Sequence, residues 1–297
     1  MPALALSWWV FSAALNAFLA PLIAVIADRV PRRSRGTASA VYGGGLIVGQ
    51  VLGSVVGSVF LSDPEGGLGI VPGVIAVTGV IVTILAPDSP WTGDRPEPVT
   101  LAHTLSALSI RDFSWVLAGR LLLMTAVAMI LGFQLFILTD YIGLGAVEAR
   151  EVLVGAGLLI GALAFAATLL FGIVSDRLDR RRIPVLLAAL LVAGGALIPI
   201  VAPTVAGFLV FVAIAALGYG GYQAVDTALM TEVLPSASDR ARDLGILNVA
   251  NAGGQALGPA LVPLVLAMAG GYPAVFGAAV VAAALAALCM LPIRSTR

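Results

Sequence analysis

The chain is poor in the residues that carry most polar chemistry. It contains no lysine, one cysteine and one histidine among 297 residues, and only 11% of its residues are charged. The single cysteine, Cys289, excludes an intrachain disulfide bond. The sequence has no nucleotide-binding loop, zinc-ligand spacing or nucleophile elbow, so we expect no cofactor, no metal site and no enzyme activity.

Apolar residues are abundant instead. They make up 60% of the chain, and the mean hydropathy is +1.06, which is more apolar surface than a soluble fold of this length can bury. The apolar runs are each about 17–25 residues long, the length of a helix that crosses a bilayer core. Nine runs fall at residues 8–27, 38–61, 70–86, 115–138, 152–174, 183–202, 205–229, 244–269 and 273–291. Because they do not alternate with a period of two, they predict an all-α, polytopic membrane protein in contact with the lipid bilayer.

The sixteen basic residues, all arginine, are unevenly distributed. Fourteen of them follow the first, third, fifth, seventh and ninth runs, Arg120 lies within a run, and only Arg150 lies on the opposite side. Arginine accumulates in cytoplasmic loops. We therefore expect a multi-pass protein of the cell (inner) membrane with its C-terminus in the cytoplasm and Met1 on the outer side. The arginine clusters are short and close to the spans, so we expect no nucleic-acid partner.

One segment of the chain is repeated. Arg35-Gly36 leads, after twelve residues, into Gly49-Gln50-Val51-Leu52-Gly53, and Arg240-Ala241 leads, after twelve residues, into Gly254-Gln255-Ala256-Leu257-Gly258. Each matched pair is 205 positions apart, and Leu85-Ala86-Pro87 matches Met290-Leu291-Pro292 at the same offset. A repeat of this kind inside a membrane protein is typical of the duplicated bundles of secondary transporters.

Two sets of motifs resemble the major facilitator superfamily, whose members have two six-helix halves joined by a long cytoplasmic loop. The first set is similar to the loop signature G-x-x-x-D-R-x-G-R-R, with Asp179 at the second glycine, and comprises Gly172, Asp176, Arg177, Arg180 and Arg181. The second set is similar to the fifth-helix pattern G-x-x-x-G-P-x-x-G and comprises Gly49, Gly53 and Gly57, with Ser54 in place of proline, and the second copy Gly254, Gly258 and Pro259.

The resemblance also gives a register for the nine runs. They look like helices four to twelve of a twelve-helix member, with the first three helices lacking. This register implies a partial N-terminal half-bundle of three helices at 1–86, a proline-rich cytoplasmic central linker at 87–114 and a six-helix bundle at 115–297. Asp28-Arg29 also fits the loop signature, which would make it the loop after helix two, but the 205-residue repeat favours the later register.

Asp226 is the main candidate for chemistry within the membrane, because a charge in the hydrocarbon core costs about 2.5–3.5 kcal/mol on insertion scales. It lies nine residues before Pro235, hence roughly 13 Å of helix inside that loop. It is a candidate proton carrier or gating residue; the alternative is an acid that reaches headgroup water. Arg120 either snorkels to the cytoplasmic face or pairs with an acid such as Asp226 or Asp176.

Other polar residues are candidates for the same substrate and proton pathway. Asn248, Asn251 and Gln255 share one helical face, which we expect to line a cavity, with hydrogen bonding between helices as the alternative. The remaining candidates are Gln134, Tyr222 and Gln223. Beside them, the glycines at 218, 220 and 221 allow close helix approach or bending.

The resemblance implies roles for both sets of motifs. The loop residues would form a cytoplasmic charge-relay clasp that holds one side closed and loosens when the two halves rock. The alternative is that these arginines only set the topology. We expect the glycines of the second set to serve tight helix packing more than ligand binding.

The leading hypothesis is a secondary active transporter that moves a small solute by alternating access, coupled to protons, with symport and efflux antiport both open. The alternative is a truncated, non-transporting membrane fragment, or a binding or assembly partner of another membrane protein. The sequence fixes neither the substrate, nor the direction of transport, nor the oligomeric state.

Overall fold

The computed structural model of the chain describes Ala14 and residues 29–59, 64–85, 107–178, 181–233 and 240–293. These residues form helices and their connections, with no strand among them. The long helices are α2 (Arg35–Val59), α3 (Pro64–Leu85), α5 (Arg111–Leu131), α7 (Ala146–Leu178), α8 (Arg182–Val201), α9 (Val205–Val233), α10 (Arg240–Ala269) and α11 (Tyr272–Cys289). The short ones are η1 (Arg32–Ser34), η2 (Ala107–Ser109), α6 (Gln134–Phe136) and η3 (Ile137–Tyr141).

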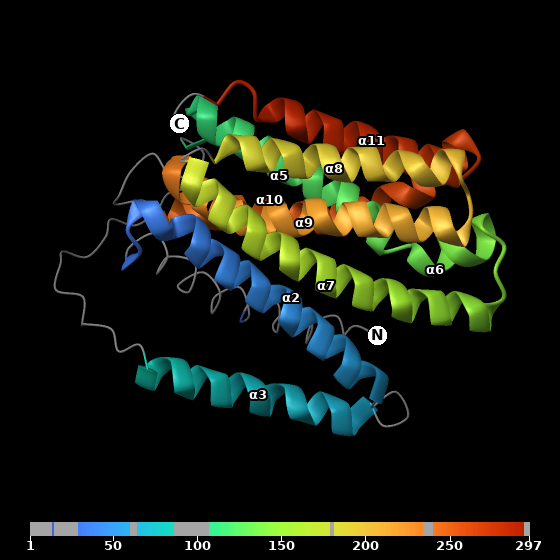
Figure 1. Cartoon of the computed structure of the whole chain (residues 1–297), viewed down its shortest axis with the longest axis horizontal. Coiled ribbons are helices and arrows are strands. Elements are labelled where there is room, and N and C mark those ends of the chain that lie inside the picture. The colour runs from blue at the N-terminus through green and yellow to red at the C-terminus, as the bar shows by residue number, and fades with distance from the viewer. Residues whose placement is uncertain are drawn as a thin grey trace.

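The helices after α3 pack as one bundle, and α2 lies along one side of it (Figure 1). Within the bundle, α9 packs against both α7 and α8, while α5 packs against α10 and α11. The α2 helix packs against α7 and α9, and α3 lies beyond α2 on the far side from the bundle. The arrangement therefore places α2 next to the same helix, α9, that carries Asp226.

Six of the described helices are long and apolar enough to cross a membrane, and they coincide with the last six predicted runs. The α2 helix covers the second run but is not among these six, and the apolar stretch of α3 that covers the third run, Gly69–Ile84, is shorter. The first run, at 8–27, lies outside the described residues apart from Ala14. Most of the linker expected at 87–114 lies outside them as well.

The fourth run differs from its prediction. A single helix was expected at 115–138, but α5 begins at Arg111 and ends at Leu131. Gly132 and Phe133 interrupt it, and the chain continues through α6 into η3, which is a π-helix. The backbone ψ of Phe133 is 14°, outside the helical region, so the hydrophobic pattern continues past a break that hydropathy cannot detect.

The internal repeat is visible in the backbone. The two copies begin helices at matched residues, because α2 begins at Arg35 and α10 begins at Arg240. The helices that follow them, α3 and α11, also end at nearly matched positions, since α3 ends at Leu85 and α11 ends at Cys289, one residue before the match of Leu85. The sequence repeat therefore corresponds to a repeat of helices.

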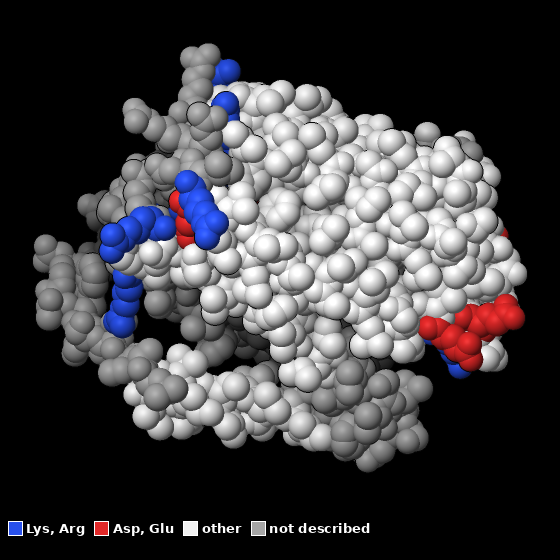
Figure 2. Space-filling view, viewed as in Figure 1, with Lys and Arg blue, Asp and Glu red and all other residues white. Residues whose placement is uncertain are grey.

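On the face that Figure 2 shows, the described charged residues gather at the two ends, and the described surface between them is almost free of charge. One end carries exposed arginines at the starts of α5 and α8 and at the end of α7: Arg111, Arg182 and Arg177. The opposite end carries exposed acids at η3 and the start of α7: Asp140, Glu148 and Glu151. An apolar belt between two charged ends is the surface expected of a membrane-spanning bundle.

Candidate functional site

The centre of the candidate site is an ion pair between α5 and α9. Arg120 and Asp226 form a salt bridge and a hydrogen bond through the guanidinium Nη1 and the carboxylate Oδ2. Both residues are buried, with 7% and 3% of their surface exposed. Arg120 therefore pairs with an acid and does not snorkel, and Asp226 does not reach headgroup water. A buried charge pair in an apolar bundle is stable only while both partners are present.

Close helix packing holds α9 in place. A Cβ atom on Gly218 would lie 2.7 Å from the carbonyl oxygen of Ala188 on α8, and a Cβ on Gly220 would overlap the backbone of Ala164 on α7. The Thr168 hydroxyl of α7 donates a hydrogen bond to the Gly220 carbonyl at 2.9 Å. These contacts confirm the close approach expected from the glycines, and they fix the height of Asp226 in the bundle.

A polar cavity of about 470 Å³ opens beside the ion pair. Four helices line it, namely α2, α5, α9 and α10. Six of the predicted pathway residues lie in its wall: Arg120, Gln223, Asp226, Asn248, Asn251 and Gln255. Asn248, Asn251 and Gln255 therefore face the cavity from one side of α10, as their spacing predicted. Their amide side chains line the same cavity as Arg120 and Asp226.

Three tyrosines surround the ion pair, and sequence reasoning found only one of them. Tyr222 is buried and interacts with Asp226 on its own helix. Tyr219 on α9 and Tyr42 on α2 interact electrostatically with both charges and line the polar cavity. A signal for Tyr42 was present, because Tyr42, Leu46 and Gln50 follow at intervals of four on α2 and all line this cavity.

A second cavity of about 490 Å³ adjoins the polar one and is mainly apolar. Its walls come from α2, α7, α9, the end of α5 and α6, with Val192 of α8. Gln134 lies in this cavity and not among the residues that line the polar one, so the structure separates it from the other predicted pathway residues. The position of Gln134 just after the break in α5 explains the difference.

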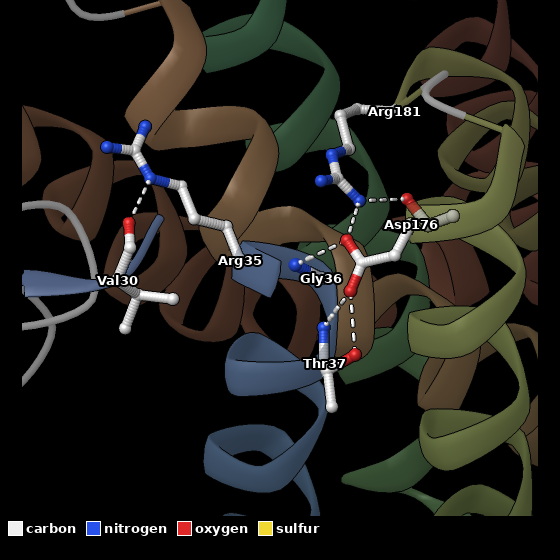
Figure 3. Close-up of polar contacts among 7 residues, drawn as sticks. Val30, Arg35, Gly36, Thr37, Asp176 and Arg181 are labelled. Carbon is white, nitrogen blue, oxygen red and sulfur yellow. Dashed lines mark hydrogen bonds and ion pairs between the residues drawn. The ribbon is translucent and has the colours of Figure 1, made fainter. Parts of the chain in front are cut away.

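A polar cluster joins α7 to the first turn of α2 at the arginine-rich end (Figure 3). The Asp176 carboxylate accepts hydrogen bonds from the backbone N–H groups of Gly36 and Thr37, at 2.9 and 2.7 Å, and from the Thr37 hydroxyl at 2.7 Å. It also pairs with Arg181 at 2.6 Å. Because the first N–H groups of a helix have no partner within the helix, Asp176 caps α2 from another part of the chain.

Small residues permit this close contact. A Cβ atom on Gly172 would overlap the Ala40 side chain of α2. A Cβ on Gly36 would in turn overlap the Asp176 carboxylate. Arg181 has only 1% of its surface exposed and also donates to the Ser175 hydroxyl at 2.8 Å. We name this cluster the clasp, and define it as Gly36, Thr37, Gly172, Asp176 and Arg181.

Two of the predicted loop residues are not part of the clasp as described. Arg177 is exposed at the end of α7. Arg180 lies outside the described residues. The donors in the first turn of α2 could not be predicted from the sequence, because every residue except proline has a backbone N–H group and the residue pattern does not distinguish them.

The two copies of the glycine motif differ in their surroundings. Cβ atoms on Gly254 and Gly258 would each lie 2.6 Å from a side chain of α5, so α10 and α5 pack at backbone distance. Pro259 lines the polar cavity beside them. No atom of the described residues lies within 4 Å of a Cβ placed on Gly49 or Gly53, and the surroundings of Gly57 are not described. The tight packing is thus present in the second copy and not seen in the first.

Comparison with known proteins identifies the family and the similar folds. A family model described as Major Facilitator Superfamily matches residues 1–205 and 154–297. A crystal structure of an MFS transporter, FucP, in the outward conformation is similar with a TM-score of 0.70 and 14% identity, over 91% of this chain and 70% of that one. A structure of a variant of the E. coli fucose:proton symporter FucP is similar with a TM-score of 0.68 and 16% identity, over 91% and 72%. No curated protein matches this chain.

Proposed function

Because the chain belongs to the major facilitator superfamily, we propose that it is a secondary active transporter that moves a small solute by alternating access, with Asp226 carrying a proton. The observation that carries this proposal is the buried Arg120–Asp226 pair in the wall of a polar cavity. A cavity of about 470 Å³ is within the usual range for small-molecule sites. The arginine stays charged at any physiological pH, so Asp226 is the partner that can change its charge.

The clasp supports an alternating-access cycle. We propose that it holds the arginine-rich end closed, and that this end faces the cytoplasm in the cell membrane. Arg181 pairs with the Asp176 carboxylate within the second group of helices, those after residues 87–114. Gly36 and Thr37 of α2, in the first group, donate hydrogen bonds to that carboxylate from across the two groups. Movement of one group relative to the other must break these bonds. The structural likeness to FucP in its outward conformation fits a state with the arginine-rich end closed.

A second candidate function is assembly with another membrane protein. It is favoured by the outer face of α2 and by α3, where Leu52, Val77 and Ile84 are 59%, 59% and 70% exposed. In the second copy, the face that corresponds to Gly49 and Gly53 is covered by α5. A helix from a partner could cover the first copy in the same way, and the chain would then act as one component of a larger unit.

Reconstituted protein in vesicles that enclose a pH-sensitive dye tests the main proposal. We expect at least one solute in a panel of sugars, amino acids and organic acids to drive proton movement, and L-fucose belongs in the panel because one structural neighbour is a fucose:proton symporter. Asp226→Asn should abolish the proton movement. Solute uptake that an uncoupler leaves unchanged would contradict proton coupling, and no uptake of any solute would favour the assembly function.

A further inference from the structure

The polar and apolar cavities are neighbouring chambers with shared walls. Gln50, Val127, Leu131 and Tyr219 line both of them. On α9, which begins at the acid-rich end, the apolar chamber is lined from Phe211 to Tyr219 and the polar chamber from Tyr219 to Asp226. The polar chamber therefore lies deeper toward the clasp, and the apolar chamber lies nearer the acid-rich end.

The balance of charge at the ion pair restricts the cargo. In the resting state the two charges cancel, and the site is neutral. A proton on the Asp226 carboxylate removes the negative charge that this residue places beside Arg120 in a buried site, which is unfavourable. An anion that takes the place of the carboxylate restores neutrality, whereas a cation or a neutral molecule does not. The total charge of the pair therefore stays unchanged only when a proton and an anion bind together.

The surroundings of the pair do not change this balance. Among the residues that the structure describes, the titratable groups that interact with both charges are the phenols of Tyr42 on α2 and of Tyr219 and Tyr222 on α9, which are neutral in their protonated form. The residues that α10 presents to the polar chamber, Asn248, Asn251, Gln255 and Pro259, carry no charge. The phenols and amides can donate hydrogen bonds to an anion but cannot compensate Arg120.

We propose that the cargo is an amphipathic organic anion, with its carboxylate or similar head group at Arg120 and its apolar body in the apolar chamber, and that it moves together with one proton on Asp226. This inference rests on the proposed function and specifies it as symport. The proton binds the Asp226 oxygen that now contacts Arg120, the anion takes over the guanidinium, and release of both re-forms the pair.

The apolar chamber argues against a sugar as the cargo. Its wall includes Ile47, Ile130, Val154, Leu158, Phe211 and Val212. A molecule with hydroxyl groups on every side would leave several of them without hydrogen-bond partners against these side chains, which costs free energy. A phenyl or alkyl body would instead bury apolar surface there.

Binding to the purified full chain in detergent tests the inference without requiring transport. The probes are 4-phenylbutyrate, 4-phenylbutanol and 4-phenylbutylamine, which share a body and differ in the head group, together with acetate and L-fucose. We expect 4-phenylbutyrate to bind at least tenfold more tightly than the other four, and more tightly at pH 5.5 than at pH 7.5. Asp226→Asn should bind it more tightly than the unmodified chain does at pH 7.5, because the variant has no carboxylate to compete for Arg120. Arg120→Gln should lose the preference for the carboxylate over the alcohol.

A pair of glycine substitutions on α7 tests the apolar chamber. Gly157 lines it, Gly155 does not, and no described atom lies within 4 Å of a Cβ on either. Gly157→Leu should weaken binding of 4-phenylbutyrate at least tenfold, while Gly155→Leu should leave it unchanged. A carboxylate that binds no better than the alcohol, or equal effects of the two leucines, would overturn the inference.

The two proposals fail in different ways. Proton-coupled uptake of L-fucose, with no preference for the carboxylate probe, would overturn the anion inference and leave the proposed transport function standing. Tight, pH-dependent binding of 4-phenylbutyrate without any uptake into vesicles would support the anion site and contradict transport.

Discussion

Asp176 on α7 accepts hydrogen bonds from both the backbone N–H and the hydroxyl of Thr37 on α2, each at 2.7 Å. The two residues are 139 positions apart in the chain. The contact links α2, which precedes the linker expected at 87–114, to α7, which follows it, and it lies at the first turn of α2 and near the end of α7 (Figure 3). A single carboxylate thus bonds to both the backbone and the side chain of a helix that also packs along α7 and α9.

Removal of the Asp176 charge should loosen the clasp. Hydrogen bonds to charged groups are worth about 1.5–3 kcal/mol, so Asp176→Asn should shift the equilibrium toward separation of α2 and α7 by roughly tenfold or more. Ala40, which is buried where α2 meets Gly172, is a suitable reporter position. With Cys289→Ser as background, Ala40→Cys should react faster with a maleimide when Asp176→Asn is also present.

Arg177→Gln is the matched control for this experiment, because Arg177 is the exposed neighbour of Asp176 on the same helix. It should leave the rate of labelling unchanged. Equal acceleration by both substitutions would mean that loss of any charge at this end acts on the bundle, and the specific role of the clasp would then be wrong.

The buried ion pair should show strong coupling in a double-mutant cycle. Asp226→Asn or Arg120→Gln alone leaves one buried charge without its partner, and each should destabilise the fold by about 3–5 kcal/mol. The double variant leaves no charge, so its loss should be smaller than the sum of the two. Thermal unfolding in one detergent measures all four proteins. If the losses of stability in the two single variants simply add in the double variant, the interaction between Arg120 and Asp226 does not stabilise the fold.

Alanine substitutions should separate the two glycine copies. Gly258→Ala places a Cβ 2.6 Å from that of Ala128 and should destabilise the α5–α10 contact by about 1–3 kcal/mol. Gly49→Ala meets no described atom within 4 Å, so the better helix propensity of alanine should leave stability unchanged or slightly higher. Thermal unfolding compares the two, and similar losses would show that the first copy is packed as tightly as the second.

The acid-rich end should depend on one tyrosine more than on its neighbour. The Tyr141 hydroxyl donates to the Pro199 carbonyl at 2.9 Å, and burial raises the pKa of this phenol. Tyr141→Phe should therefore cost about 0.5–1.5 kcal/mol near neutral pH. Tyr272→Phe is the control, because the Tyr272 hydroxyl makes only a long, exposed hydrogen bond of 3.5 Å to Asp140, and its removal should cost less.

The pH dependence of the Tyr141 contact has a definite sign. A phenol with a raised pKa holds its proton in the folded chain after the unfolded chain has lost it, so stability falls as the pH rises above the ordinary tyrosine range. This alkaline loss should be smaller in Tyr141→Phe than in the unmodified chain. An unchanged loss measured by unfolding at several alkaline pH values would contradict the assignment.

The sequence by itself determined the features of the fold that depend on amino-acid composition and on the spacing of apolar and polar residues. Lipid cannot satisfy unpaired backbone groups, so long apolar runs had to be helices, and the 205-residue repeat located the matched starts of α2 and α10. The spacing of Asn248, Asn251 and Gln255 also identified a face that lines a cavity, because three- and four-residue intervals share one side of a helix.

Only the tertiary structure decided which partners meet. Arg120 had two acids and the headgroup region open to it, and the packing of α9 against α7 and α8 brings Asp226 to its guanidinium. The break after Leu131 and the cap that Asp176 gives to α2 depend on backbone geometry, which a pattern of side chains does not encode. Composition and period report on the environment of single helices, whereas a site is made where several helices converge, and that convergence is fixed by packing between residues far apart in the chain.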